Sequence, residues 1–281
     1  MTGPAFRRDL YRGTARDYEQ FRVPYPRDLT DGLARRAGAD GTGRLLDLAC
    51  GTGQLALPLR GYFREVWAVD QEPDMISAVA RQARTAPDTT APDRTAQAGR
   101  LRLVTGAAED LAAPAAAFDL VTIGNAFHRL RRERVAAQAL RWLAPGRYLA
   151  LVWADSPWAG NAPWQLALAA TMDRWRDRSA DGAGRVPAGY EQDRRERPDA
   201  MILRDCGFEA GPTWSVPVSH EWTIEALTGF VFSTSVLSRA ALGARAAEFA
   251  ADLRRELLGG APDGRFRQVI SFGCELARRP V

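Results

Sequence analysis

The sequence predicts an α/β fold in which a mostly parallel sheet carries helices on both faces. Short apolar runs at residues 44–49, 65–70, 101–105, 118–124 and 147–153 have the length and composition of buried parallel strands. Segments with helical character separate several of these runs. Such alternation of strands and helices is typical of parallel crossover units.

The elements around these strands follow from local signals. Two helical segments are expected within residues 6–40, the second starting near Asp28 after two prolines. The first strand ends in a glycine turn, after which the chain turns helical at once. Residues 85–99 lack an apolar face and predict an exposed loop. The helices expected in the first half of the chain cover about residues 55–59, 75–84 and 131–142.

The pattern changes after Trp153, where helices outnumber strands. Residues 178–195 are rich in Gly, Arg and Asp and predict a linker, and Gly207 ends a short helix. The remaining segments expected are helices over residues 164–176, 198–206, 223–232 and 238–258, a strand over residues 212–221, and either a closing strand or a short helix over residues 266–277.

Length and composition are those of a globular protein. The chain has 281 residues, of which 46% are hydrophobic and 26% charged, enough for one large core with an insertion. We find no apolar run of membrane-spanning length and no apolar signal-peptide region near the N-terminus, so a cytoplasmic location is expected. Cys50, Cys206 and Cys274 are odd in number and scattered. They predict neither a disulfide framework nor a metal site.

The charge balance is mildly basic but does not predict nucleic-acid binding. The net charge is +4, the pI is about 9.3, and every basic residue is arginine. Arginine clusters at residues 129–134 and 194–197 are interleaved with acids or fall on possible helix faces. They are interpreted as solvated helix surface, so no nucleic acid and no membrane is expected as a partner.

The glycine turn after the first strand indicates a nucleotide-like ligand. Gly51 and Gly53 fit the dinucleotide pattern, and Asp70, nineteen residues after Gly51, could accept hydrogen bonds from a ribose. These features alone suit NAD. Asp47 inside the strand favours another ligand, because a buried carboxylate is costly without a partner and S-adenosylmethionine (SAM) offers an ammonium group.

Five motifs together resemble those of class I SAM-dependent methyltransferases. They occur in the family order, and the likeness is strong over about residues 5–155 and loose beyond. The nearest relatives resemble small-molecule enzymes of the ubiquinone/menaquinone and trans-aconitate type. The motifs are residues 46–53, 66–76, 106–111, 118–128 and 143–151.

The resemblance implies a doubly wound, Rossmann-like sheet of seven strands with an α-helical cover inserted after the fifth. It divides the chain into an N-terminal helical lid (1–40), a SAM-binding core (41–154), and a substrate cover with the closing strands of the sheet (155–281). It also places the final strand at residues 266–277.

The resemblance also assigns cofactor contacts. Asp47 would meet the SAM amino group directly or through water, or would instead be held by backbone N–H groups. Asp70 would bind the ribose, and Met75 would line the adenine slot or only the core. Ala107 stands where the family usually has a polar residue, which leaves Glu109, backbone at Ala108 or water to hold the adenine amino group. The residues assigned to the cofactor are Tyr18, Arg22, Asp47, Ala49, Gly51, Gly53, Asp70, Gln71, Met75, Ala108, Glu109 and Asn125.

Tyr18 and Arg22 lie four residues apart, so both can face one side of a helix. In the lid that the resemblance implies, Arg22 would pair with the methionine carboxylate and Tyr18 would approach the sulfonium. A surface helix capping the sheet is the alternative.

His128 follows the fourth strand and is the candidate catalytic residue. It would act as a general base or as a polar wall of the substrate site. With an ordinary pKa, its imidazole would lose its capacity as a base below about pH 6.5. The residues expected near the substrate are Tyr11, Trp153, Trp158 and His220.

The expected function is SAM-dependent methyl transfer to an oxygen or nitrogen atom of a small, bulky, apolar specialised metabolite. The alternative is a SAM-fold binding module or a cyclase-like catalyst, because fold does not fix function. The sequence lacks the N/D-P-P-Y/F tetrapeptide of enzymes that methylate the exocyclic amines of bases. The expected assembly is a monomer or homodimer.

Overall fold

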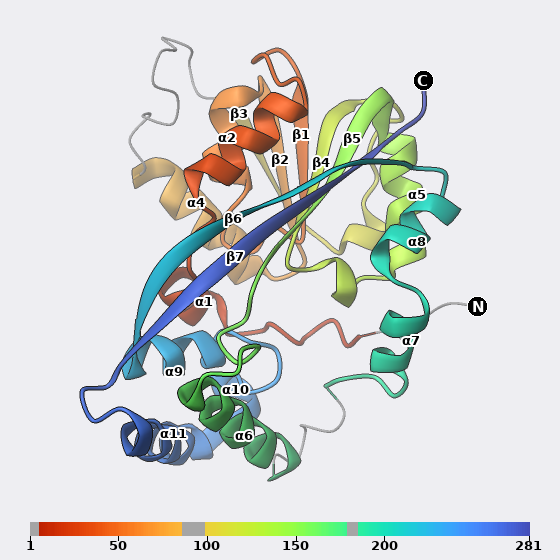
Figure 1. The fold of residues 1–281 in the computed structure, drawn as a ribbon. Coiled ribbons are helices and arrows are strands. Elements are labelled where there is room, and N and C mark those ends of the chain that lie inside the picture. The colour runs from red at the N-terminus through yellow and green to blue at the C-terminus, as the bar shows by residue number, and fades with distance from the viewer. Residues whose placement is uncertain (1–5, 86–98, 179–184) are drawn as a thin grey trace.

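The computed structural model describes residues 6–85, 99–178 and 185–281. Seven strands form one sheet in the order β3-β2-β1-β4-β5-β7-β6 (Figure 1). The first five are mutually parallel, and β7 runs antiparallel to both β5 and β6. The predicted α/β fold is therefore confirmed, with a mixed sheet. The strands are β1 (Arg44–Leu48), β2 (Glu65–Asp70), β3 (Arg100–Thr105), β4 (Phe118–Gly124), β5 (Leu143–Ala154), β6 (Glu209–Thr223) and β7 (Arg265–Arg278).

Some helices connect the parallel strands. Others, which we call the lower helices, form a separate group beyond the carboxyl ends of β1 to β5 (Figure 1). Among the described residues, no helix is both long and apolar enough to cross a bilayer. The α-helices are α1 (Ala15–Phe21), α2 (Arg27–Arg36), α3 (Ala56–Leu59), α4 (Pro73–Thr85), α5 (Arg132–Trp142), α6 (Pro163–Arg178), α7 (Tyr190–Glu196), α8 (Asp199–Asp205), α9 (Ile224–Phe232), α10 (Arg239–Leu242) and α11 (Ala246–Gly260), and the 3-10 helices are η1 (Arg60–Tyr62), η2 (Ala108–Asp110), η3 (Phe127–Arg129) and η4 (Gly243–Arg245).

Successive side chains along a strand belong alternately to two hydrophobic cores. Leu45 of β1 belongs to the core that includes side chains of α2, α3 and α4, whereas Leu46 belongs to the core that includes α5 and α8. The first core continues without a break into the lower helices through Trp175, Phe249 and Leu253. Sheet and lower helices therefore share one core on this side.

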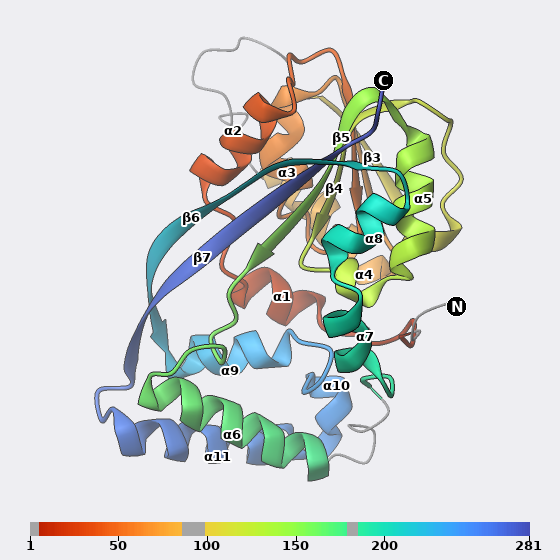
Figure 2. The ribbon, with the colours of Figure 1, turned by 45° about the vertical axis from the view of Figure 1, so that its right-hand side comes forward.

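The lower helices come from two separate insertions. Helix α6 follows β5, whereas α9, α10 and α11 lie between β6 and β7 in the chain, and the views in Figures 1 and 2 both show them as one group. Helix α1 lies between this group and the sheet. Gly229 of α9 allows close contact with α1, because a Cβ there would lie 2.1 Å from the Phe21 ring.

The single helix expected over residues 238–258 is divided into α10, η4 and α11. Two further expectations differ from the structure. The linker expected over residues 178–195 contains the start of α7, and β5 begins at Leu143, four residues before the expected start. Arg132 explains the difference in the linker, because its buried guanidinium pairs with Asp193 of α7 at 2.6 Å and with Asp199 of α8 at 2.7 Å. Arg132 is thus not the solvated residue expected from the arginine cluster. The loop expected at 85–99 lies largely outside the described residues.

The glycine turn after β1 contains a strained alanine. Ala49 has φ +50° and Gly51 has φ +55°, so both occupy the left-handed region that glycine tolerates and alanine disfavours.

Replacement of Ala49 by glycine is expected to raise the free energy of unfolding by about 1 kcal/mol, because the left-handed strain disappears. Ala107 is the control, because it has an ordinary φ of −72°. Ala107→Gly should lower stability by about 0.5–1 kcal/mol. Urea unfolding of the three proteins measures both effects, and a destabilised Ala49→Gly variant would contradict the strain.

Candidate functional site

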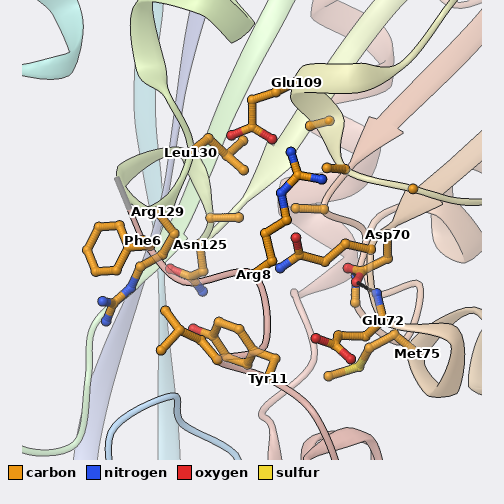
Figure 3. A pocket seen from close by; sticks show the side chains of 18 of the residues that line it. Phe6, Arg8, Tyr11, Asp70, Glu72, Met75, Glu109, Asn125, Arg129 and Leu130 are labelled. Carbon is orange, nitrogen blue, oxygen red and sulfur yellow. Dashed lines mark hydrogen bonds between the residues drawn. The ribbon is translucent and has the colours of Figure 1, made fainter. Parts of the chain in front are cut away.

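The carboxyl ends of β1, β2 and β4 open into a cavity, which we call the first cavity. The strand order reverses between β1 and β4, and ligands of open α/β sheets bind at such switch points. Figure 3 shows Asp70, Glu72 and Met75 on one side of this cavity, Arg129 and Phe6 on the other, and Asn125 between them.

Asp70 ends β2 and is held in place by the backbone. Its two carboxylate oxygens accept hydrogen bonds from Gly51 N and Glu72 N, both at 2.9 Å. Burial raises its pKa above the ordinary value, although these hydrogen bonds act in the opposite direction. Each carboxylate oxygen accepts more than one hydrogen bond, so Asp70 retains capacity for a diol in the cavity.

The rest of this end fits an adenosine group. Met75 is almost fully buried against the cavity, and Ala108 and Glu109 line it from η2. Glu109 Oε1 accepts a hydrogen bond from Arg131 N at 3.0 Å, which fixes its carboxylate. A Cβ on Gly106 would point into open space within the cavity, so glycine leaves room there. A carboxylate, apolar walls and an open glycine backbone are the features that a ribose and adenine require.

Asp47 lies beneath the cavity and does not line it. Its side chain is 1% exposed, with Oδ2 accepting from Ala56 N at 3.0 Å and Oδ1 from Thr122 Oγ1 at 2.7 Å. One backbone N–H and one hydroxyl thus hold the carboxylate, and its contact with a ligand ammonium, direct or through water, stays a prediction. Asp47 joins β1, β4 and the start of α3.

The segment carrying Tyr18 and Arg22 covers the glycine turn. The Tyr18 ring lies against Gly51, where a Cβ would be 3.4 Å from the ring. The Arg22 guanidinium lies over the rings of Tyr18 and Phe230, at 4.6 and 4.4 Å from their centroids, and its Nε donates to Ser233 Oγ at 2.8 Å. Both side chains line the first cavity, as expected of a lid.

A second cavity adjoins the first on the side of β5 and the lower helices. Its walls include Trp158, Trp222 and Phe230, which make edge-to-face contacts, with Phe230 at 5.8 and 5.4 Å from the two indole centroids. It also includes His128, which is absent from the first cavity. The two cavities share the side chains of Tyr11, Tyr18, Arg22, Asn125 and Arg129.

Asn125 fixes the boundary between the cavities. It has φ +50°, a conformation that asparagine tolerates better than most residues. Its amide donates to the Tyr25 hydroxyl and accepts from Ala154 N, both at 3.2 Å. The ends of β4 and β5 are thereby tied together at the boundary.

His128 lies in the second cavity as a neutral imidazole. Burial lowers its pKa to about 3, assisted by the positive charges of Arg129, Arg194 and Arg132. The expectation of an ordinary pKa is therefore wrong. An imidazole with so low a pKa stays unprotonated near pH 7 and is a weak general base. The imidazole can still accept or donate a hydrogen bond as a polar wall of the cavity.

Several expected contacts lie outside both cavities. Gly53 packs under α3 and α4, where a Cβ would lie within 3.2 Å of Leu57 and Val79. Trp153 lies over Gly273 of β7, and His220 packs edge-on against Trp222 at 4.3 Å. The expected residues that line a cavity are Tyr11, Tyr18, Arg22, Ala49, Gly51, Asp70, Gln71, Met75, Ala108, Glu109, Asn125, His128 and Trp158.

Sequence reasoning missed Arg129, which it treated as solvated surface. Its Nε and Nη1 atoms are buried, and it lines both cavities. The signal was its place directly after His128 and the fourth strand, where ligand-facing residues are expected. Phe6, Arg8 and Leu130 were also missed.

Comparison with known proteins supports a methyltransferase assignment. Residues 46–151 match the family model of a methyltransferase domain. An uncharacterized methyltransferase of Mycobacterium tuberculosis is 33% identical over 136 residues, 48% of each chain. An uncharacterized methyltransferase-like protein of Schizosaccharomyces pombe is 26% identical over 57% of this chain and 56% of its own. The matches thus span about half the length of these curated relatives.

Solved structures share the fold over most of the chain. A proposed type II methyltransferase of Anaeromyxobacter dehalogenans is 26% identical, with a TM-score of 0.56 over 92% of this chain and 99% of the other. The 4+2 cyclase SpnF is 20% identical, with a TM-score of 0.51 over 93% of this chain and 84% of its own. The sheet and helix arrangement therefore fits the Rossmann-like methyltransferase fold, and likeness to SpnF shows the fold alone.

Asp47 should make stability fall as pH rises from about 4 to about 7. Burial raises its folded pKa from 3.8 to about 7. Within this window the folded protein keeps a proton that the unfolded chain has released, so rising pH favours unfolding. Relative to Asp47→Asn, wild-type stability should decline by as much as about 4 kcal/mol, at about 1.4 kcal/mol per pKa unit. Urea unfolding at several pH values measures the free energy of unfolding of both proteins. An equal dependence of this free energy on pH in wild type and Asp47→Asn would contradict the prediction.

His128 should remain neutral throughout pH 5–8. Proton NMR of the two imidazoles tests this, with His128→Gln identifying the signals. His220 is the internal reference, because partial burial lowers its pKa from 6.5 to a lesser degree. A His128 signal that shifts with a midpoint near pH 6.5 would restore the role of general base.

Proposed function

We propose that the protein transfers a methyl group from SAM to an oxygen or nitrogen atom of a small, bulky, apolar molecule. The observation that carries this proposal is the pair of adjoining cavities with five shared side chains. One has the carboxylate and apolar walls that suit adenosine, and the other has an aromatic lining. The sequence likeness to ubiquinone/menaquinone and trans-aconitate enzymes is part of this proposal.

In this proposal, the residues of the first cavity hold and orient the cofactor. Asp70 accepts hydrogen bonds from the ribose, while Met75 and Ala108 contact the adenine. The backbone at Ala49 and Gly51 allows close approach, and Arg22 supplies a positive charge near the boundary. Asp47 supports the loop from below.

The chemistry needs little acid or base from the protein. Bound SAM supplies a methyl group already activated by the positive sulfonium. The chain's task is to align the acceptor and keep water out. Tyr18 and Asn125 stand where the two cavities meet, and His128 offers a hydrogen bond to the acceptor. An amine that is already neutral, or an oxygen that is already ionised, suits such a site better than an alcohol.

The second cavity favours a small acceptor over a macromolecule. Side chains from β5, α6, β6, α9 and β7 line it, including Met172, Trp222 and Phe272, and Trp158 lines it from the loop between β5 and α6. One chain supplies all of these walls, so a monomer or a homodimer with independent sites suffices. A cyclase-like reaction in the same cavities is the competing activity. It would consume an acceptor without forming S-adenosylhomocysteine.

Asp70→Ala should weaken SAM binding at least about tenfold. It removes charge-assisted hydrogen bonds to the ribose, each worth about 1.5–3 kcal/mol, and about 1.4 kcal/mol corresponds to one decade. Asp74→Ala is the matched control, because Asp74 is an exposed carboxylate at the start of α4, four residues after Asp70 and outside the cavity. Calorimetry with SAM and with NAD measures both. Tighter binding of NAD, or an Asp70→Ala variant with wild-type SAM affinity, would contradict the assignment.

A further inference from the structure

Arg129 is a half-buried cation without an anionic partner in the described part of the chain. Its Nε and Nη1 atoms are inaccessible and have no hydrogen-bond partner. Its side chain forms no ion pair with any described residue, whereas Arg132, three residues on, is held by two aspartates. A buried guanidinium is costly unless an anion offsets it.

Aromatic rings hold the Arg129 side chain in place. The guanidinium carbon lies 4.6 Å from the Phe6 centroid and 5.8 Å from the Tyr190 centroid. Phe6 and Tyr190 contact each other edge-to-face at 5.0 Å. Ring faces position a cation and leave its N–H groups available for a ligand.

The position of Arg129 separates it from the adenosine end. Figure 3 shows it on the opposite side of Asn125 from Asp70 and Met75. It is one of the residues shared with the second cavity, and it follows His128 directly in the chain. Its charge contributes to the lowered pKa of His128.

The charges of the second cavity favour an anion. Arg22 and Arg129 contribute two positive charges to its lining, and Asp155 is the one acidic side chain among the described residues there. Asp155 lies near the surface and accepts a hydrogen bond from Ser271 N at 3.2 Å. The rest of the lining is mainly aromatic and aliphatic.

We propose that Arg129 binds a carboxylate of the acceptor, so that the substrates of this site are aromatic or polycyclic carboxylic acids. The planar guanidinium fork matches a carboxylate, and the aromatic lining of the second cavity takes the apolar body. This inference rests on the proposed function for the identity of the first ligand. It adds the chemical class of the second.

Paired probes test the inference without knowledge of the natural acceptor. The probes are benzoate, 2-naphthoate and indole-3-acetate, each beside its uncharged carboxamide. Calorimetry on the full chain, with and without S-adenosylhomocysteine, gives their affinities. At least one carboxylate should bind wild-type protein about tenfold or more tightly than its carboxamide, as expected for a charge-assisted pair. Equal binding within every pair, or no binding of any carboxylate, would overturn the inference.

Three variants locate the effect. Arg129→Gln should bring each carboxylate within about threefold of its carboxamide, and Arg129→Lys should keep part of the preference because the charge remains. Arg131→Gln is the matched control, because it removes an exposed positive charge two residues after Arg129 in the chain. Arg131 lines the first cavity but not the second. It should leave the preference unchanged. A preference that survives Arg129→Gln, or that Arg131→Gln abolishes equally, would overturn the assignment to Arg129.

The competing role for Arg129 is recognition of the cofactor's own carboxylate. The affinity ratio of S-adenosylhomocysteine to 5′-methylthioadenosine, which lacks that carboxylate, measures it. The ratio should be the same in wild type and Arg129→Gln, and a tenfold fall in the variant would overturn the inference. Failure of the proposed function gives a different result, in which S-adenosylhomocysteine does not bind wild type while the carboxylate preference persists.

Discussion

The buried carboxylate of Asp47 is the interaction on which the site depends. One oxygen accepts a hydrogen bond from the Thr122 hydroxyl of β4, and the other accepts one from the Ala56 N–H. One side chain thus joins two central strands to the helix after the glycine turn. Helix α3 is only four residues long and could not fix the turn by itself. The strain at Ala49 is tolerated because the strand before it and the helix after it are both held.

Helix α1 and the lower helices form one layer over the cavities. Arg22 lies between the rings of Tyr18 and Phe230, which come from α1 and α9. Asp17 of α1 is buried and pairs with Arg239 of α10 at 3.0 Å. Movement of α1 away from the glycine turn would break both contacts. Access to either cavity is therefore coupled to the packing of α1 on the helices inserted between β6 and β7.

The sequence predicted what local patterns determine and missed what distant partners determine. The ends of β2 and β4, and the cavity residues after them, followed from apolar runs and glycine motifs. The environment of the arginine cluster at residues 129–134 could not be predicted from such local patterns. Arg132 is buried because α7 and α8 supply aspartates, and Arg129 because Phe6 and Tyr190 enclose it. Arg129 itself is half-buried, with two atoms inaccessible. The partners of both arginines lie at least 60 residues away in the chain, and no period in the sequence marks them.

The same reasoning explains why the expected pKa of His128 was wrong. Position after the fourth strand predicted its presence in a cavity, but its pKa depends on burial and on three arginines from two parts of the chain. Those charges favour a neutral imidazole and an anionic ligand together. Under the proposed function, a site of this kind gains rate from alignment and exclusion of water, because its groups near the acceptor are cationic or neutral. The pH dependence of turnover would then belong to the acceptor, whose own ionisation decides when its nucleophilic atom is available.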